Sequence, residues 1–181
     1  MKKLLILFWV FLFSLLTACS TVSTQDIKVE AESDPKANLA AYHSYVWLGA
    51  LGVLNDPEKK WQPTDVDLAG DIKYLIDREL RKHKIFGAKK EADLGVAYFL
   101  GVDMDAMQLK NDPETQVDVL ENVPKGALVV TLVDMKTGYV VWLGSAKANI
   151  IKQFKAEVAR ERLDYSISTM FKNLKGKGLL K

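Results

Sequence analysis

The spacing of hydrophobic residues predicts a series of strands and two helices. Over residues 27–32, apolar side chains occupy every second position and charged side chains lie between them. A period of two is typical of a half-buried strand, so the first strand is predicted here. A second strand is predicted over about 44–48. The next stretch, 49–64, holds two glycines and two prolines and is predicted to be a loop.

Two longer segments have the period of an amphipathic helix. The first begins near Thr64 or Asp65, either of which is a suitable N-cap, and basic residues gather at its end. The second covers about 155–175. Each segment has one apolar stripe that must pack against another element. The stripes consist of Leu68, Ile72, Leu75, Ile76 and Leu80 in the first segment and of Ala159, Leu163, Ile167, Met170, Phe171 and Leu174 in the second.

Three further strands are predicted in the second half of the chain. Residues 94–107 are mostly apolar on both faces and begin to alternate only toward their end. Residues 127–135 and 139–151 are rich in branched side chains and form the other two strands. The polar stretch 108–125 contains two prolines and has no clear period, so it is predicted to be a loop.

The last two strands are predicted to form a hairpin. Lys136, Thr137 and Gly138 join them, and Gly138 is placed to take a positive φ. Trp142 is expected to pack against a helix, because small residues follow it on its strand. The pattern as a whole predicts an α+β fold, with an antiparallel or mixed β-sheet of five or more strands and two amphipathic helices packed on one face. Residues 27–181 are predicted to form this single periplasmic domain.

The first eighteen residues are predicted to be a signal peptide. Met1, Lys2 and Lys3 form a short basic start, and residues 4–16 are apolar except for Ser14. An apolar run of about 13 residues is shorter than the roughly 20 that a permanent transmembrane helix needs. Residues 1–18 are therefore set apart from the fold.

The residues that follow, Leu16, Thr17, Ala18 and Cys19, resemble the lipobox of bacterial lipoproteins. The resemblance implies a thioether-linked diacylglycerol on Cys19, cleavage before this residue, and acylation of the new amino terminus, with palmitate among the acyl chains. Residues 19–26 would then be a lipidated tether. Several acyl chains hold a protein firmly on a membrane, because each buried CH2 contributes about 0.8 kcal/mol. The alternative is an ordinary secreted protein whose cysteine is incidental.

The residue after the cysteine bears on the choice of membrane. In well-studied Gram-negative bacteria an aspartate at this position favours the inner membrane, whereas this chain has Ser20. By that resemblance the protein is expected to be lipid-anchored on the outer membrane, facing the periplasm, in preference to the inner membrane. Eight residues separate Cys19 from Ile27. At about 3.6 Å per residue, the first strand would lie within about 29 Å of the lipid.

Several stretches of the chain resemble one known family. They are YHSYVW at 42–47, ADLGVAY at 92–98, GALVVTLVD at 126–134 and VWLGSA at 141–146. These are similar to the domain-of-unknown-function 4136 family of bacterial envelope lipoproteins. The resemblance covers nearly the whole chain after the signal and implies the fold and an envelope location. The family has no agreed activity, so the resemblance implies no chemistry.

Charge and cysteine content exclude several classes of function. The chain has 181 residues, with 25 Lys and Arg against 23 Asp and Glu, which gives no electrostatic reason to expect nucleic acid as a partner. Removing Lys2 and Lys3 with the signal leaves 23 basic and 23 acidic side chains. Cys19 is the only cysteine, so neither an intramolecular disulfide nor a multi-cysteine zinc site can form.

Residues of the types that carry catalysis are scattered. His43 and His83 are far apart, and His83 is expected to interact with the end of the first helix and with Glu79. Asp103 and Asp105 would project from one strand face about 7 Å apart, which suits paired carboxylates but is also typical of an exposed strand end. A solvated acidic loop lacks the spacing of an EF-hand calcium site. Its carboxylates are Asp112, Glu114, Asp118 and Glu121.

We therefore predict no catalytic residue, no cofactor and no metal site, with Cys19 as the lipid acceptor, and three hypotheses for the function remain. The favoured one is a non-catalytic domain that binds an envelope protein partner or supports envelope organisation, with the membrane held through the acyl chains on Cys19. The second is a module that binds a small amphiphile, either between the sheet and the helices or under the 49–64 stretch. An enzyme such as a hydrolase is the weakest, because no nucleophile, base or metal set is visible. The apolar residues of the 49–64 stretch are Leu51, Val53, Leu54 and Trp61.

Overall fold

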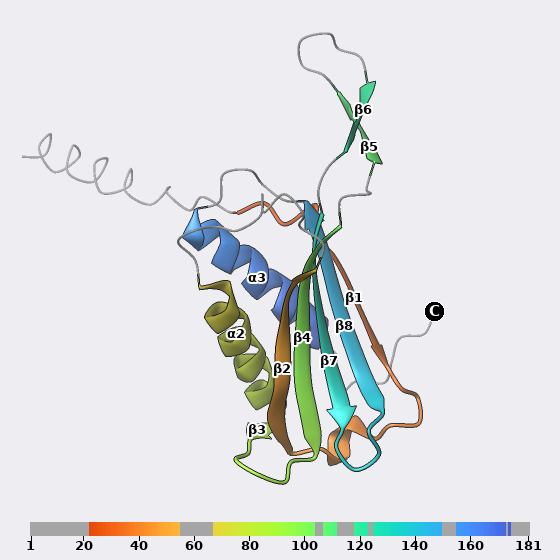
Figure 1. The fold of residues 1–181 in the computed structure, drawn as a ribbon, viewed down its shortest axis with the longest axis vertical. Helices are drawn as coiled ribbons and strands as arrows, with labels where there is room; N and C mark the ends of the chain where they lie inside the picture. Colours follow the sequence, from red (N-terminus) through yellow and green to blue (C-terminus); the bar gives the residue numbers. More distant parts are fainter. Residues whose placement is uncertain are drawn as a thin grey trace, which may run out of the picture.

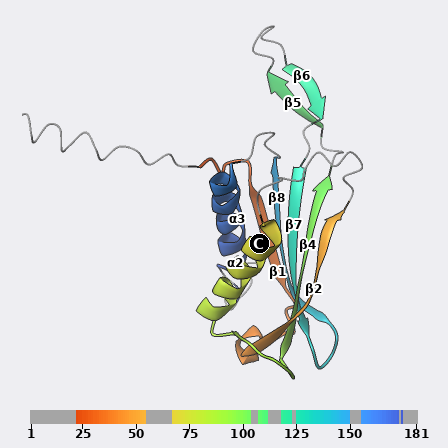
Figure 2. The same ribbon diagram turned by 60° about the vertical axis from the view of Figure 1, so that its left-hand side comes forward.

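A computed structural model describes residues 22–54, 67–103, 107–111, 118–122, 125–149, 155–172 and 174. Within them the chain forms a six-stranded sheet, and two helices lie on one face of that sheet (Figures 1 and 2). The predicted α+β fold class, a mixed sheet of more than five strands with both helices on one face, is confirmed. The predicted signal peptide 1–18 and Cys19 lie outside the described residues.

The six-stranded sheet is mixed in direction. Its strands are β1 (Lys28–Ser33), β2 (Ser44–Leu54), β3 (Phe86–Gly87), β4 (Leu94–Asp103), β7 (Lys125–Asp134) and β8 (Val140–Asn149). Their order across the sheet is β1-β8-β7-β4-β2-β3. Pairing is antiparallel from β1 to β4 and parallel from β4 through β2 to β3. The parallel pair β2 and β4 needs a crossover connection, and a helix between them supplies it.

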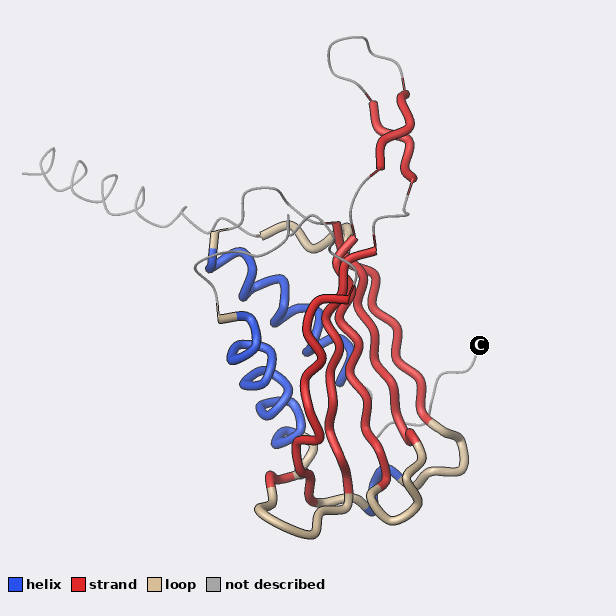
Figure 3. The backbone as a smooth tube through the Cα atoms, viewed as in Figure 1, coloured by secondary structure: helices blue, strands red, loops and turns tan. Residues whose placement is uncertain are grey.

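The two ends of the sheet differ in what they carry. At one end, which we call the entry end, β1 and β7 begin and β2, β4 and β8 end. Both helices also begin there (Figure 1). At the opposite end, the turn end, residues 135–139 join β7 to β8. A small hairpin of β5 (Met107–Asn111) and β6 (Asp118–Asn122) stands apart from the main sheet beyond the entry end (Figure 3).

The helices α2 (Leu68–Lys82) and α3 (Ala156–Phe171) form where the apolar stripes predict them. The N-cap of α2 is Asp67, whose carboxylate accepts a hydrogen bond of 3.0 Å from the backbone N–H of Gly70. The predicted caps Thr64 and Asp65 lie outside the described residues. The stripe residues that are fully buried are Ile72, Leu75, Ile76 and Leu80 on α2 and Ala159, Ile167, Met170 and Phe171 on α3.

Trp142 packs against α3, as its sequence context predicts. The side chain is buried, and its ring centroid lies 4.7 Å from that of Phe171. Gly144 lies beneath the indole, where an added Cβ would come within 3.0 Å of Cζ2 of Trp142 and 3.2 Å of Cβ of Met170. A residue without a side chain at this position therefore allows the tryptophan and the helix to approach the strand closely.

The structure corrects the two predicted loops. β2 continues to Leu54, so the prediction of a loop from residue 49 is wrong over 49–54. β2 pairs with β4 along this length through register shifts, which accommodate the glycines within a strand. The predicted loop 108–125 is wrong in part, because it contains most of β5 and all of β6. The strand predicted over 94–107 is β4, which ends at Asp103.

The turn between β7 and β8 agrees with its prediction. Gly138 has a φ of 77°, in the left-handed region that favours glycine. Asp134 supports the same turn, because its carboxylate accepts hydrogen bonds from the backbone N–H groups of Lys136 at 2.7 Å and Thr137 at 2.9 Å.

Two further short elements were not predicted, namely β3 and a turn of 3-10 helix over Leu39–Ala41.

Candidate functional site

The two histidines contact different partners. The backbone N–H groups of His43 and Ser44 donate to the carboxylate of Asp93 at 2.8 and 2.9 Å, which fixes the start of β2 to the start of β4. These hydrogen bonds hold the pKa of Asp93 below its usual range. His83 follows the last turn of α2, and its Nε2 lies 2.8 Å from the backbone oxygen of Phe171 on α3.

The partner expected for His83 is bound by other residues. The carboxylate of Glu79, which is buried, accepts hydrogen bonds of 2.9 Å from Nε of Arg78 and from Nζ of Lys82. Arg78 also forms an ion pair with Asp164 of α3. These charges join the two helices to each other, so the histidine contributes to the helix contact and not to a site with Glu79.

The other candidate residues either lie on strands of the structure or fall outside the described residues. Asp103 is the last residue of β4, and Asp105 lies outside the described residues. Leu51, Val53 and Leu54 lie on β2, and Trp61 lies outside. The acidic residues 118 and 121 belong to β6, whereas 112 and 114 lie outside. In the part of the chain that the structure describes, no group of three or more metal-binding side chains occurs.

An ion pair between Asp26 and Arg162 fixes the chain just after the predicted lipid acceptor. Arg162 lies on α3 with its side chain buried, and its two terminal nitrogens donate to the two carboxylate oxygens of Asp26 at 2.9 and 2.6 Å. The same guanidinium donates to the backbone oxygen of Ser23. The carboxylate of Asp26 also accepts a hydrogen bond of 2.9 Å from the backbone N–H of Asn149 at the end of β8. We call this set of four residues the anchor clamp.

The charges of the anchor clamp stabilise each other. Burial alone would raise the pKa of Asp26, but the hydrogen bonds from Arg162 and Asn149 and the positive charge of Arg162 outweigh burial and lower that pKa. A two-pronged pairing of guanidinium and carboxylate defines orientation as well as energy. From Ser23 onward the chain is therefore held on α3 and on the end of β8.

A second polar cluster joins α2 to the sheet. The carboxylate of Asp77 accepts hydrogen bonds from the hydroxyl of Tyr45 and, at 3.0 Å, from the indole N–H of Trp47. Burial is the larger cause and the hydrogen bond to Asp77 the next, and together they raise the pKa of Tyr45 above its usual value. Nζ of Lys73 lies 5.4 Å from the centroid of the Trp47 ring, within cation–π range. This cluster holds the first strand of the parallel pair against the helix.

The face of the sheet opposite the helices, which we call the outer face, is apolar. Leu128, Val130 and Leu132 of β7 are buried under the helices, so the alternate positions of β7 and of its neighbours point to the outer face. At the turn end the side chains of Leu48 and Met135 meet over Gly95. The apolar residues of the outer face are Val46, Leu48, Ala97, Phe99, Val129, Val133, Met135 and Leu143, and Thr131 and Ser145 are polar residues that lie among them.

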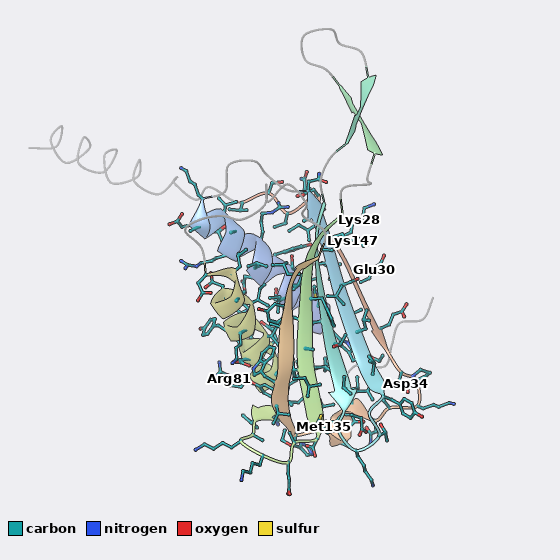
Figure 4. The ribbon with its side chains drawn as sticks, viewed as in Figure 1. Lys28, Glu30, Asp34, Arg81, Met135 and Lys147 are labelled. Carbon is teal, nitrogen blue, oxygen red and sulfur yellow. The ribbon has the colours of Figure 1, made fainter. Side chains whose placement is uncertain are left out.

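Charged residues border this apolar surface. Lys28, Glu30 and Glu32 lie on the same side of the edge strand β1, and Lys147 of β8 is the direct cross-strand partner of Lys28. Charges on an edge strand discourage further strand pairing, and β1 carries them at this edge of the sheet. Figure 4 shows Lys28 and Lys147 together at the entry end and Met135 at the turn end.

Sequence reasoning missed the anchor clamp and the outer face. The outer face had a weak signal, since β4 and the strand at 127–134 are apolar at nearly every position, as strands buried on both faces are. Only one of the two faces is covered by helices among the described residues. For the anchor clamp, the only indication in the sequence is that Arg162, a charged residue, occupies a position on the apolar stripe of the second predicted helix.

These features define a two-layer α+β domain in which Ser23 and Asp26, before β1, are bound to Arg162 of α3. Residues 29–174 match the domain of unknown function DUF4136, so the chain belongs to this family. A search of curated proteins finds no match. In the part of the chain that the structure describes, no helix has the length and apolar character needed to cross a bilayer.

Solved structures with a similar arrangement share little sequence with this chain. A DUF4136 family protein from Bacteroides thetaiotaomicron is 13% identical, with 85% of this chain and 100% of that chain covered and a TM-score of 0.52. The PelC dodecamer from Paraburkholderia phytofirmans is 14% identical over 80% and 97% of the two chains, with a TM-score of 0.44. A minor lipoprotein from Acinetobacter baumannii is 14% identical over 74% and 93%, with a TM-score of 0.35. At 13% identity the similarity to the DUF4136 family protein from Bacteroides thetaiotaomicron shows the fold alone.

Proposed function

We propose that this protein is a lipid-anchored envelope protein of the outer membrane whose periplasmic domain binds a protein partner and catalyses no reaction. The observation that carries the proposal is the apolar outer face, which the two helices leave uncovered. Monomeric soluble proteins rarely present large contiguous apolar surfaces, and those that do commonly use them to bind other proteins. The charged border formed by β1 beside this apolar surface fits the usual division of an interface into an apolar core and a polar rim.

The described carboxylates support a binding function in preference to catalysis. A general base must reach the proton that it removes from the substrate. Asp77 and Glu79 instead accept hydrogen bonds from donors on the protein, and Asp93 and Asp134 hold the starts of strands and a turn. These contacts lie within a helix, within a turn or between two elements, and they are of the kind that stabilises a fold.

The lipid anchor is tested by replacing its acceptor. Cys19→Ala should abolish labelling of the protein with a radioactive fatty acid and leave a precursor that retains its signal, because no other thiol is present. Persistent lipid labelling in that variant would refute the anchor. In a host that follows the aspartate rule, Ser20→Asp should move part of the protein to inner-membrane fractions, and an unchanged distribution would contradict the outer-membrane assignment.

Photo-crosslinking tests the outer face as the binding surface. Leu143 of β8 and Tyr165 of α3 have the same exposed fraction, 40%, but Leu143 lies on the outer face and Tyr165 on a helix. A benzophenone amino acid is placed at either position in the lipidated protein, and intact cells are illuminated. We expect a discrete adduct from position 143 and none from position 165, with the partner identified by mass spectrometry.

The pattern of adducts decides between the hypotheses. An adduct from position 143 that contains a protein of the envelope supports the proposal. Equal adducts from both positions would indicate non-specific contact and contradict it, as would an adduct from position 165 alone. An adduct at position 143 that contains lipid and no protein would replace it with the amphiphile hypothesis.

A further inference from the structure

The anchor clamp shortens the connection between the predicted lipid and the folded domain. The backbone oxygen of Ser23 is bound by Arg162, and four residues separate Cys19 from Ser23. A chain of four residues spans at most about 14 Å at about 3.6 Å per residue. The free length is therefore half of that expected for a tether that ends at the first strand.

The clamp joins three elements at the entry end of the sheet. Ser23 and Asp26 precede β1, Arg162 is on α3, and Asn149 ends β8. An attachment through β1 alone would leave the domain free to pivot about a single strand. Because the guanidinium of Arg162 contacts the backbone of Ser23 and both carboxylate oxygens of Asp26, the direction in which the chain leaves the domain is fixed.

The strands run away from this end. β8 has ten residues, so the turn end lies about 33 Å from the entry end at about 3.3 Å per residue. A connection of at most about 14 Å keeps the entry end within that distance of the lipid while the clamp is closed, and it places no such limit on the turn end. The entry end, beyond which the β5–β6 hairpin also projects (Figure 3), is therefore the part of the domain that is held near the membrane surface.

The charges along β1 suit this orientation. Lys28 and Lys147 are direct cross-strand partners at the entry end and both are exposed, whereas Glu30 and Glu32 follow at increasing distance from that end. Like charges directly opposite each other weaken a strand pair. Negatively charged phosphate groups next to the two lysines would remove this repulsion, and their attraction extends over a Debye length of about 8 Å.

We propose that the Asp26–Arg162 pair holds the domain upright on its membrane, with Lys28 and Lys147 against phosphate-bearing lipid headgroups and the β7–β8 turn directed away. The inference rests on the proposed lipid anchor. In this orientation the strands stand roughly along the membrane normal, so the outer face is presented sideways, to partners at the same membrane, along the full height of the domain.

The orientation is tested with a probe at each end of the domain. Glu157→Cys lies in the first turn of α3 at the entry end, and Lys136→Cys lies in the exposed β7–β8 turn. Lipidated protein, in which the thiol of Cys19 is consumed by the lipid, is labelled with bimane at the new cysteine. It is then reconstituted into vesicles of phosphatidylethanolamine and phosphatidylglycerol that contain a lipid with a nitroxide on its headgroup. We expect severalfold stronger quenching at position 157 than at position 136.

Two variants separate the clamp from the lysines. Asp26→Asn keeps the size of the side chain but removes its charge, and the difference in quenching between the two positions should shrink towards equality. The double variant Lys28→Gln and Lys147→Gln should reduce quenching at position 157, while the control Lys136→Gln, examined with the probe at 157, should not. Circular dichroism confirms that each variant is folded.

Different results would refute different parts of the reasoning. Equal quenching at both positions in protein with an intact clamp and a lipid on Cys19 overturns the orientation while leaving the anchor in place. An unchanged difference in the Asp26→Asn variant removes the clamp from the explanation, and unchanged quenching in the lysine variant removes the headgroup contact. Mass spectrometry of the amino-terminal peptide reports the lipid itself, and its absence would refute the proposed anchor and the inference together.

Discussion

Replacing Arg162 is the sharpest test of the energetics that the structure implies. Arg162→Leu keeps an apolar side chain on α3, shorter than that of arginine, and removes every donor to Ser23 and Asp26. Arg160→Leu, two residues earlier on the same helix, is a matched control. Arg160 also pairs with an aspartate, Asp71 of α2, through a contact of 2.7 Å. The two pairs differ in the burial of the arginine and in the number of hydrogen bonds that it donates.

Burial decides the size of the expected effect. The side chain of Arg162 is 6% exposed, and removing one partner of a buried pair costs about 3–5 kcal/mol because the other charge is left without compensation. Asp26 is 24% exposed, so water partly replaces the lost donors and the loss should lie near the lower value, about 3 kcal/mol. Arg160 is 56% exposed, and a pair of that kind contributes about 0–1 kcal/mol.

Urea denaturation of the purified domain measures both losses. A decrease of about 3 kcal/mol would lower the midpoint by about 1–3 M at an m-value of about 1–3 kcal/mol/M. The double variant Asp26→Leu and Arg162→Leu should recover part of the loss, because it removes the uncompensated carboxylate along with its partner. Equal small losses for Arg162→Leu and Arg160→Leu would refute the reasoning, since they would mean that the clamp contributes no more than a surface pair.

Three further predictions concern stability. Trp142→Ala should cost about 3–5 kcal/mol, because a large buried side chain against Phe171 is lost, whereas Tyr139→Ala should change the midpoint little because Tyr139 is 73% exposed. Gly138→Ala should lower the free energy of unfolding by about 1 kcal/mol, because alanine disfavours the positive φ at this position. Gly49→Ala is the control and should be closer to neutral, because an added Cβ would meet nothing within 4 Å and Gly49 has no positive φ. Equal losses in the two variants would contradict the turn geometry. The pKa of Asp26 is lower in the folded protein than in the unfolded chain, so the unfolded chain binds the proton more tightly. The ionised Asp26 therefore adds to the free energy of unfolding in full above the unfolded pKa of about 3.9, and this addition is lost as the pH falls through the lower folded pKa. Urea melts of the native protein and Asp26→Asn across this acid range should show a shallower loss in the variant, and parallel curves would rule out this contribution.

The elements with strong local patterns were predictable from the sequence. The strand at β1, both helices and the turn at Gly138 follow from hydrophobic spacing, charge placement and the special conformation of glycine. The end of β2 and the β5–β6 hairpin were not predictable in the same way. Residues 49–54 contain two glycines, and only pairing with β4, distant in sequence, holds them in a strand. Long-range pairing overrides local propensity in such segments.

The anchor clamp shows where sequence reasoning stops and why. Arg162 lies three residues after Ala159 and eight before Met170, so helical spacing places a positive charge on the buried stripe of α3. A charge in that position requires a partner, because an unpaired buried guanidinium is strongly unfavourable. The identity of the partner is not a local property, since the sequence holds 23 carboxylates and Asp26 is 136 residues away. Only the antiparallel placement of β1 beside β8 brings Asp26 to Arg162, in the second turn of α3. The same tertiary contact that escapes prediction is therefore the one that links the predicted lipid anchor to the folded domain.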